Sequence, residues 1–359
     1  MKKVLATILA LVMALSVTTM AWADDVAKIG NTGYATLKEA IEHVANGETI
    51  VLTANVNNGD GIVVASGKNF TLDFAGHTYT ITQNVVGSTG TESQCFQLLK
   101  DSTITMKDGA IVANCAGAKM IIQNYCNLTL DNMKLDATVG TNNVEYVVSN
   151  NCGNVVIKNG TTITAKTTGV AFDVYGGFGD YGDVSVTLEA GATVNGKVEV
   201  ARSSGNQNKN TLTVTGGTVN GDLAVTPSEK TEVAVTGGTF SSDVSAYAAG
   251  NTPVASNNGT YYVGAETIQN AANTLSAGQQ LKIEKGTVAI NGAEYSAGGN
   301  ATYTKPSSGG YYYYQPTTDT KTTDTKGSPK TFDAGIALYV GMALTSAAGV
   351  AFVGKKRED

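Results

Sequence analysis

The chain has few of the residues that carry enzyme chemistry and polyanion binding. Its 359 residues include two histidines, one tryptophan and five prolines; 15% are charged, and the net charge is −6. Arg202 and Arg357 are its only arginines. Basic patches mark nucleic-acid-binding proteins, and guanidinium groups bind polyanions through paired hydrogen bonds. The composition therefore predicts no nucleic-acid partner.

Cysteine is also scarce, with Cys95, Cys115, Cys126 and Cys152 as the four examples. No two of them have the C-x-x-C spacing of a zinc site. We predict no cofactor, and the sequence does not say whether another metal binds. An even number of cysteines in an exported chain permits disulfides. Free thiols buried as small apolar side chains are the alternative interpretation, with equal weight.

Glycine is abundant, with 42 residues, and it punctuates a repeated unit. TLTVTGGTV occupies residues 211–219, and TEVAVTGGTF occupies residues 231–240. Alternating apolar and polar residues place one set of side chains on one face of a strand. Paired glycines permit positive φ angles and hence a sharp corner. The unit therefore predicts short strands separated by tight turns.

The same unit recurs upstream, each time as an apolar-x-apolar pair followed by a third apolar residue. The seven copies are Leu72/Phe74/Tyr79, Ile104/Met106/Ile111, Leu128/Leu130/Leu135, Val155/Ile157/Ile163, Val186/Leu188/Val194, Leu212/Val214/Val219 and Val233/Val235/Phe240. A short apolar strand precedes each copy. Two or three strands per turn of about 20 to 30 residues are typical of a parallel β-helix. We predict an all-β fold with β-helix repeats over 61–253.

This register places the cysteines at the corners of adjacent rungs. Cys126 and Cys152 fall shortly before equivalent strands, and Cys95 and Cys115 fall just before the opening strands of adjacent rungs. Stacked strands lie about 5 Å apart, which is within the Cα separation that a disulfide needs. We predict the pair Cys126–Cys152 first and the pair Cys95–Cys115 second.

Two helix–strand segments are predicted to cap the repeats. In the N-terminal cap, residues 24–60, Thr36 and Glu39 have the spacing of a capping box before an amphipathic helix. Residues 267–283 align without gaps on 36–52. We therefore predict a C-terminal cap over 254–303, because open ends of a repeat array need covering.

The two ends of the chain predict export and anchoring. Residues 1–23 have the positive start, apolar core and A-W-A cleavage site of a signal peptide. Residues 304–331 form a Tyr/Thr/Pro spacer. Residues 332–359 contain a long apolar segment and a basic tail, and the apolar segment is long enough to cross a bilayer as a helix. We expect an extracellular protein anchored to the cell wall or the membrane.

The C-terminal end resembles the sorting signal of Gram-positive cell-wall-anchored surface proteins. In that family a sortase cuts a Leu-Pro-x-Thr-Gly pentapeptide that precedes an apolar helix and a basic tail. Pro329, Lys330 and Thr331 match this pattern, whereas Ser328 replaces the leucine and Phe332 the glycine. The resemblance implies sortase and the cell wall as partners; without cleavage, the apolar helix stays as a membrane anchor.

Residues 36–243 resemble the right-handed parallel β-helix proteins of the pectate-lyase-like type. Enzymes of that fold carry calcium-binding carboxylate clusters with a basic residue, or Asn-Thr-Asp, Asp-Asp and Gly-His-Gly signatures. None of these is present, and His77 lies in the sequence AGHTY. We therefore assign no catalytic residue.

A long insertion interrupts the repeat after residue 174, and it holds the candidate ligand-binding residues. They are Asp173, just before the insertion, and Tyr175, Asp180, Tyr181 and Asp183 within it. Clustered carboxylates bind calcium, and a suitably spaced pair can hydrolyse a glycoside. The alternative is that these aspartates and the neighbouring glycines are ordinary loop residues.

We interpret the chain as a non-enzymatic surface protein for adhesion or glycan binding, with glycans or the host extracellular matrix as its partners. A polysaccharide-active lyase or hydrolase is one alternative, because a carboxylate pair can act on a glycoside. A structural surface-layer component without a soluble ligand is the other. The predicted tether indicates display outside the cell and does not identify the ligand.

Overall fold

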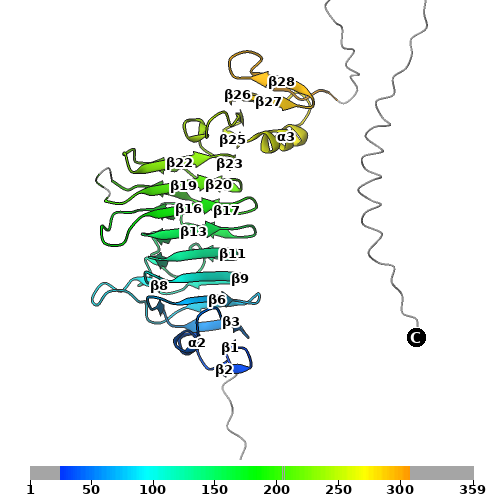
Figure 1. Cartoon of the computed structure of the whole chain (residues 1–359). Coiled ribbons are helices and arrows are strands. Elements are labelled where there is room, and N and C mark those ends of the chain that lie inside the picture. Colours follow the sequence, from blue (N-terminus) through cyan, green and yellow to red (C-terminus); the bar gives the residue numbers. More distant parts are fainter. Residues whose placement is uncertain (1–24, 204, 206, 308–359) are drawn as a thin grey trace, which may run out of the picture. The chain divides into compact units, whose positions relative to one another are not determined.

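The computed structural model describes residues 25–307 except 204 and 206, and short strands stacked in rungs dominate this part (Figure 1). The predicted signal peptide, the sorting signal at 328–331 and the apolar segment of 332–359 lie outside the described residues. No helix of the described part is long and apolar enough to span a membrane.

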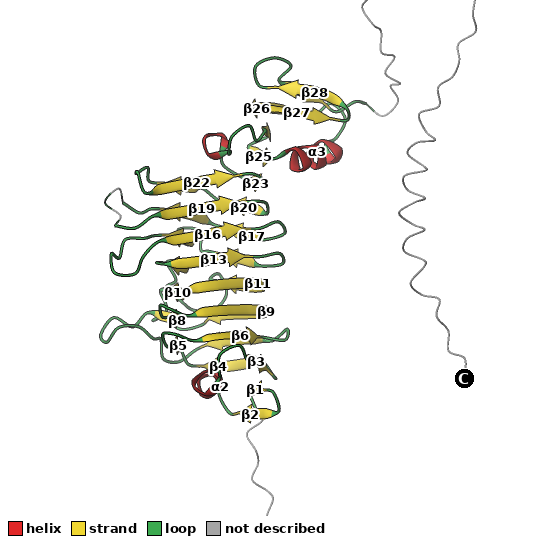
Figure 2. Cartoon of the chain, viewed as in Figure 1, coloured by secondary structure: helices red, strands yellow, loops and turns green. Residues whose placement is uncertain are grey.

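The stacked strands form three parallel columns, which we call the first, second and third faces (Figure 2). The first face contains β3 (Thr49–Leu52), β6 (Asn69–Asp73), the first halves of β9 (Thr103–Ala113) and β11 (Asn127–Asp136), β13 (Gly153–Ile157), β16 (Val184–Leu188), β19 (Asn210–Val214) and β22 (Thr231–Val235). The second face contains β4 (Val56–Gly59), β7 (Thr78–Ile81), the second halves of β9 and β11, β14 (Thr162–Thr164), β17 (Thr193–Asn195), β20 (Thr218–Asn220) and β23 (Gly238–Phe240).

The third face is a separate seven-stranded sheet. It contains β5 (Ile62–Val64), β8 (Gln94–Leu98), β10 (Met120–Asn124), β12 (Tyr146–Asn150), β15 (Val170–Val174), β18 (Lys197–Val200) and β21 (Leu223–Val225). The chain visits the three faces in turn, and this all-β arrangement of long parallel sheets fits the predicted β-helix.

The register explains the core and corrects one predicted rung. Equivalent apolar residues stack in register and are buried, as along Ile104, Leu128 and Val155. In the first rung, however, Leu72 pairs with Met106, so the unit there is Phe70/Leu72/Tyr79 and not Leu72/Phe74/Tyr79. A shift of two residues keeps every side chain on its face, so the apolar pattern could not distinguish the two registers.

The N-terminal cap is built from β1 (Ala27–Ile29), β2 (Thr32–Tyr34) and α2 (Leu37–His43), and β1 pairs antiparallel with β3. Thr36 Oγ1 accepts a hydrogen bond from the Glu39 N–H at 3.1 Å, as the predicted helix start requires. At the other end of α2, Lys68 Nζ donates to the Val44 carbonyl at 3.2 Å. A lysine there satisfies carbonyls that the helix leaves unpaired.

The C-terminal segment has its own small apolar cluster. After the short 3₁₀ helix η1 (Ser245–Tyr247) it contains β24 (Val254–Asn257), β25 (Thr260–Val263), α3 (Ala265–Thr274), β26 (Gln280–Lys285), β27 (Thr287–Ile290), β28 (Ala293–Ser296) and β29 (Thr302–Thr304). β25 pairs antiparallel with β23, the last strand of the second face. This contact continues the second face into the C-terminal segment and covers the edge of β23.

Candidate functional site

The loops that follow the strands of the third face meet at one edge of that sheet. Parallel strands point the same way, so their carboxyl ends lie on one side. The loops after β8, β10, β15 and β18 supply Lys100, Tyr125, the insertion at 175–183 and Arg202, respectively. This edge therefore gathers residues from four rungs that are far apart in the sequence.

Four aromatic side chains form what we call the aromatic cluster: Tyr125, Tyr175, Phe178 and Tyr181. The Tyr125 ring centroid lies 4.7 Å from that of Tyr181 and 6.1 Å from that of Phe178, and the Tyr175 and Phe178 centroids are 5.9 Å apart. Phe178 is 43% exposed and Tyr181 is 41% exposed. Lys100 Nζ lies 5.8 Å from the Tyr181 centroid. The cluster thus offers apolar ring surface to solvent beside a cation.

Hydrogen bonds from the next rung hold the insertion in place. The Gly176 N–H donates to Asn210 Oδ1 at 2.6 Å, and Asn208 Nδ2 donates to the Phe178 carbonyl at 2.7 Å. Asp183 Oδ1 accepts from the Lys209 N–H at 2.8 Å. These bonds fix both ends of the insertion and the backbone of its exposed phenylalanine, so the ring surface is organised before any ligand arrives.

An ion pair between a buried carboxylate and a partly exposed guanidinium supports the cluster from the strand beside it. Asp173 has no exposed surface and pairs with the Arg202 guanidinium, while its Oδ1 accepts from the Asn150 N–H at 2.6 Å. Arg202 also lies over two rings, with its Cζ 4.2 Å from the Tyr146 centroid and 4.8 Å from the Tyr175 centroid. The guanidinium therefore connects Asp173 to the aromatic cluster.

Burial outweighs the ion pair in setting the pKa of Asp173, but not in setting that of Arg202. Loss of hydration raises the pKa of Asp173 to about 6, although the Arg202 charge and the Asn150 hydrogen bond oppose the shift. Burial disfavours the charged form of Arg202 too, but the Asp173 carboxylate outweighs it and raises the pKa of the guanidinium. Asp173 is thus a carboxyl whose charge state changes close to neutral pH.

The predicted ligand-binding residues fall into two groups. Tyr175 and Tyr181 join the aromatic cluster, whereas the three aspartates do not converge: Asp173 is buried in its ion pair, and Asp180 and Asp183 are exposed. Among the described residues, no group of three or more histidine, cysteine or acidic side chains is arranged to hold a metal ion. The site geometry therefore favours the rings over the carboxylates.

Four residues of this edge were missed by sequence reasoning, and Lys100 had no signal in the sequence that set it apart. Phe178 lies inside the quoted insertion, and Tyr125 directly precedes Cys126, whose corner position the repeat register had identified. Arginine is rare in the chain, and the presence of Arg202 just after the strand at 198–200 was a usable signal. The repeat register predicts which corner a residue occupies. It does not predict that a loop from one rung folds against the loop of another rung.

The four cysteines are free thiols in the structure. Cys126 Sγ donates to Asn124 Oδ1 at 3.2 Å, and Cys152 Sγ donates to the Tyr125 carbonyl at 2.8 Å. Cys95 is buried, and Cys115 is half-buried. Both predicted disulfides stay predictions.

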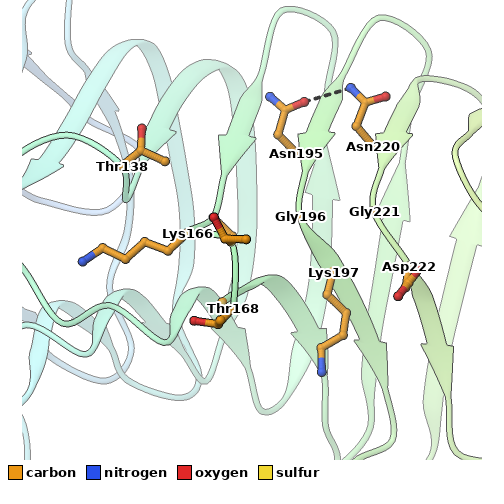
Figure 3. A pocket seen from close by; sticks show the side chains of 12 residues that line it. Thr138, Lys166, Thr168, Asn195, Gly196, Lys197, Asn220, Gly221 and Asp222 are labelled. Atoms are coloured by element: carbon orange, nitrogen blue, oxygen red, sulfur yellow. Dashed lines mark hydrogen bonds between the residues drawn. The ribbon is translucent and has the colours of Figure 1, made fainter.

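A second candidate is a groove at the corner between the second and third faces. Its volume is about 570 Å³, and it lies where the long loop at 165–169 gives way to short turns, Gly196 in one rung and Gly221 with Asp222 in the next (Figure 3). Asn220 Nδ2 donates to Asn195 Oδ1 at 2.9 Å along its wall. The groove is lined by threonine, asparagine, lysine and glycine and has no aromatic ring. It offers polar contacts without a stacking surface.

No family model matches the sequence, no curated protein matches it, and no solved structure matches the fold.

Proposed function

We propose that this protein is a non-enzymatic cell-surface protein that binds glycans through the aromatic cluster. The observation that carries the proposal is the exposed ring surface of Phe178 and Tyr181, held by the hydrogen bonds of the neighbouring rung. Sugar rings present C–H groups on their faces and hydroxyls at their edges. They therefore suit aromatic rings that combine an apolar face with a polar group, as tyrosine does.

The pre-organised backbone of the insertion supports the same proposal. A flexible loop would lose conformational entropy on binding, and this cost is reduced when the loop is already ordered. Lys100 adds a cation at the rim of the cluster. It favours glycans that carry carboxylate or sulfate groups over neutral ones.

The proposal for location rests on the two ends of the chain. The signal-peptide pattern of residues 1–23, the P-x-T sequence at 329–331 and the apolar segment with its basic tail support display on a Gram-positive cell wall or membrane. We also propose that the stacked rungs form a right-handed parallel β-helix of the pectate-lyase-like type. Treating cells with a muramidase and separating wall from membrane tests the anchor: a Thr331→Ala variant moves from the wall to the membrane fraction if sortase cleaves there.

The binding prediction concerns the double variant Phe178→Ala/Tyr181→Ala. We expect it to bind immobilised glycans at least tenfold more weakly than the unchanged chain, because removal of central aromatic contacts costs about 2 kcal/mol or more. A glycan and matrix-protein array followed by titration calorimetry measures the loss. Val139→Ala is the matched control, since Val139 is an apolar side chain of similar exposure, at 46%, outside the cluster.

The same array distinguishes the alternatives. Equal glycan binding by the double variant and the unchanged chain contradicts the proposed site. An array without any bound glycan or matrix protein favours a structural surface-layer component. Release of new reducing ends or unsaturated sugars from a polysaccharide identifies an enzyme, and then the exposed carboxylates Asp180 and Asp183 are the residues to substitute first.

A further inference from the structure

Two different rings of the aromatic cluster each have a cation beside them. Lys100 Nζ lies 5.8 Å from the Tyr181 centroid. Arg202 Cζ lies 4.8 Å from the Tyr175 centroid. The Arg202 side chain is 31% exposed, whereas the side chain of its ion-pair partner, Asp173, has no exposed surface. The positive member of this pair is therefore open to solvent beside the rings, and the negative member is not.

Contacts other than the ion pair also hold Arg202 in place. Its Cζ lies 4.2 Å from the Tyr146 centroid, and its Nη2 donates to Ser149 Oγ at 3.2 Å. Attraction between a cation and a ring, and a hydrogen bond to a hydroxyl, do not require a charge on Asp173. We therefore expect the guanidinium to stay beside the rings when Asp173 is neutral.

The surroundings of Asp173 accommodate a neutral carboxyl as well as a carboxylate. Its Oδ1 accepts from the Asn150 N–H at 2.6 Å. Its Oδ2 lies 3.4 Å from Ser149 Oγ, and a hydroxyl accepts a hydrogen bond as well as donating one, so a proton on Oδ2 has an acceptor. Loss of hydration raises the pKa of Asp173 to about 6. The carboxyl is therefore mostly charged at pH 7.5 and mostly neutral at pH 5.

The other ionisable groups around Asp173 come from its neighbouring strands and the loops that follow them. Burial raises the pKa of Tyr125 to about 12 and also raises that of Tyr146, so both keep their protons. Glu199 lies in register with Asp173, and its oxygens are occupied by Lys197 Nζ at 2.5 Å and the Tyr146 hydroxyl at 3.3 Å. The described strands β14, β16 and β19 also pack against β15, and they carry no ionisable side chain. The complete set around Asp173 is Tyr125, Tyr146, Tyr175, Lys197, Glu199 and Arg202.

We propose that the aromatic cluster binds sulfated glycans more tightly in acidic surroundings, because a proton on Asp173 leaves the charge of Arg202 uncompensated beside the rings. This inference rests on the proposed function of the cluster. The ion pair has no net charge when Asp173 is a carboxylate and a charge of one when Asp173 is neutral. The second positive charge then adds to that of Lys100. Sulfate groups keep their charge in the same pH range, whereas carboxylate groups of a glycan begin to be neutralised there.

The test titrates the full chain with dextran sulfate and with neutral dextran at pH 5 and pH 7.5. Ionic strength is held constant, because salt screens exposed charges. We expect the affinity for dextran sulfate to be about threefold or more higher at pH 5, as one additional charge near the ligand requires. Dextran should show no such difference. In Asp173→Asn the two pH values should give equal affinity for dextran sulfate. Asp180→Asn, which removes an exposed carboxylate of the same insertion, is the matched control and should keep the difference.

A second measurement needs no variant. Because the two equilibria are linked, binding of dextran sulfate at pH 6 should be accompanied by proton uptake. Calorimetry in buffers of different ionisation enthalpy measures this uptake. Equal affinity for dextran sulfate at both pH values, no proton uptake, or a pH effect that persists in Asp173→Asn would overturn the inference.

The proposed function fails by a different outcome. If the unchanged chain binds no glycan at either pH, or if Phe178→Ala/Tyr181→Ala binds as tightly as the unchanged chain, the aromatic cluster is not the binding site, and the inference is overturned with it. Binding that is lost in the double variant but is independent of pH contradicts only the role of Asp173.

Discussion

Arg202 connects more of the candidate site than any acidic residue predicted from the insertion. It neutralises buried Asp173 and lies over the rings of Tyr146 and Tyr175. A buried carboxylate without its partner is costly, typically by 3–5 kcal/mol. The aspartate that looked like a ligand-binding residue in the sequence is therefore part of the support for the rings.

The prediction at this scale is the effect of Arg202→Ala on stability and its dependence on pH. We expect a loss of about 3 kcal/mol in the free energy of unfolding at pH 7.5, because the variant leaves Asp173 buried without its partner, where it either stays charged at a cost or takes up a proton as its pKa rises further. The loss should shrink at pH 5, where Asp173, with its pKa raised to about 6, is mostly neutral. Urea unfolding at both pH values measures this.

The sign of the pH dependence follows from the direction of the pKa shift. The folded chain binds the Asp173 proton more tightly than the unfolded chain does, because the pKa rises from 3.8 to about 6 on folding. That contribution to stability is fully present below about pH 4 and is lost as the pH rises through about 6. In the control Asp173→Asn this part of the pH dependence should disappear; if it persists, another group is responsible.

At the scale of elements, the tight corner between the second and third faces depends on close approach of backbones. Gly196 has a φ of +134°, and a Cβ on Gly221 would overlap the Gly196 carbonyl oxygen. Neighbouring rungs can therefore stack closely at this corner only where the residue is glycine. The same corner forms one wall of the groove with the Asn195–Asn220 hydrogen bond.

The prediction for this element is that Gly221→Ala destabilises the chain by about 1–3 kcal/mol, because overpacking against backbone forces the strands apart. Gly298→Ala is the control, since its Cβ would meet no atom within 4 Å. Thermal unfolding followed by circular dichroism compares the two. Equal melting temperatures would show that the rungs relax around the added methyl group.

The strands were predictable because their cause is local. Alternation of buried and half-buried side chains along β16 or β19 follows from the alternating apolar and polar residues, and stacking in register follows from repetition. The helix from Leu37 to His43 was predictable for the same reason, through Thr36 and its apolar face. The contacts of the aromatic cluster depend on how loops of different lengths fold over neighbouring rungs. No local pattern encodes that.

At the scale of the whole described region, the ends of the stack determine whether it stays separate from other copies. β23 pairs with β25 of the C-terminal segment. At the start, β1 pairs with β3, and α2 packs beside them. Edge strands left open tend to pair with other chains.

The prediction at this scale concerns a chain that ends at residue 249 and so lacks β24 to β29. We expect it to associate through the uncovered edge of β23 and to melt at a lower temperature than the chain that ends at residue 307. Light scattering after size-exclusion chromatography measures the association. A monomer of unchanged melting temperature would show that the C-terminal segment does not act as a cap.

The stacked register also governs how such a protein can evolve. Val194 and Val219 occupy equivalent positions on β17 and β20, and Thr193 and Thr218 match beside them. Removing the chain between two such positions deletes a whole rung, and duplicating it adds one. In both cases every inward-facing side chain stays on its face. Homologous genes of this architecture should therefore differ in length by multiples of one repeat, and each step would displace the aromatic cluster from the C-terminal segment by about 4.8 Å.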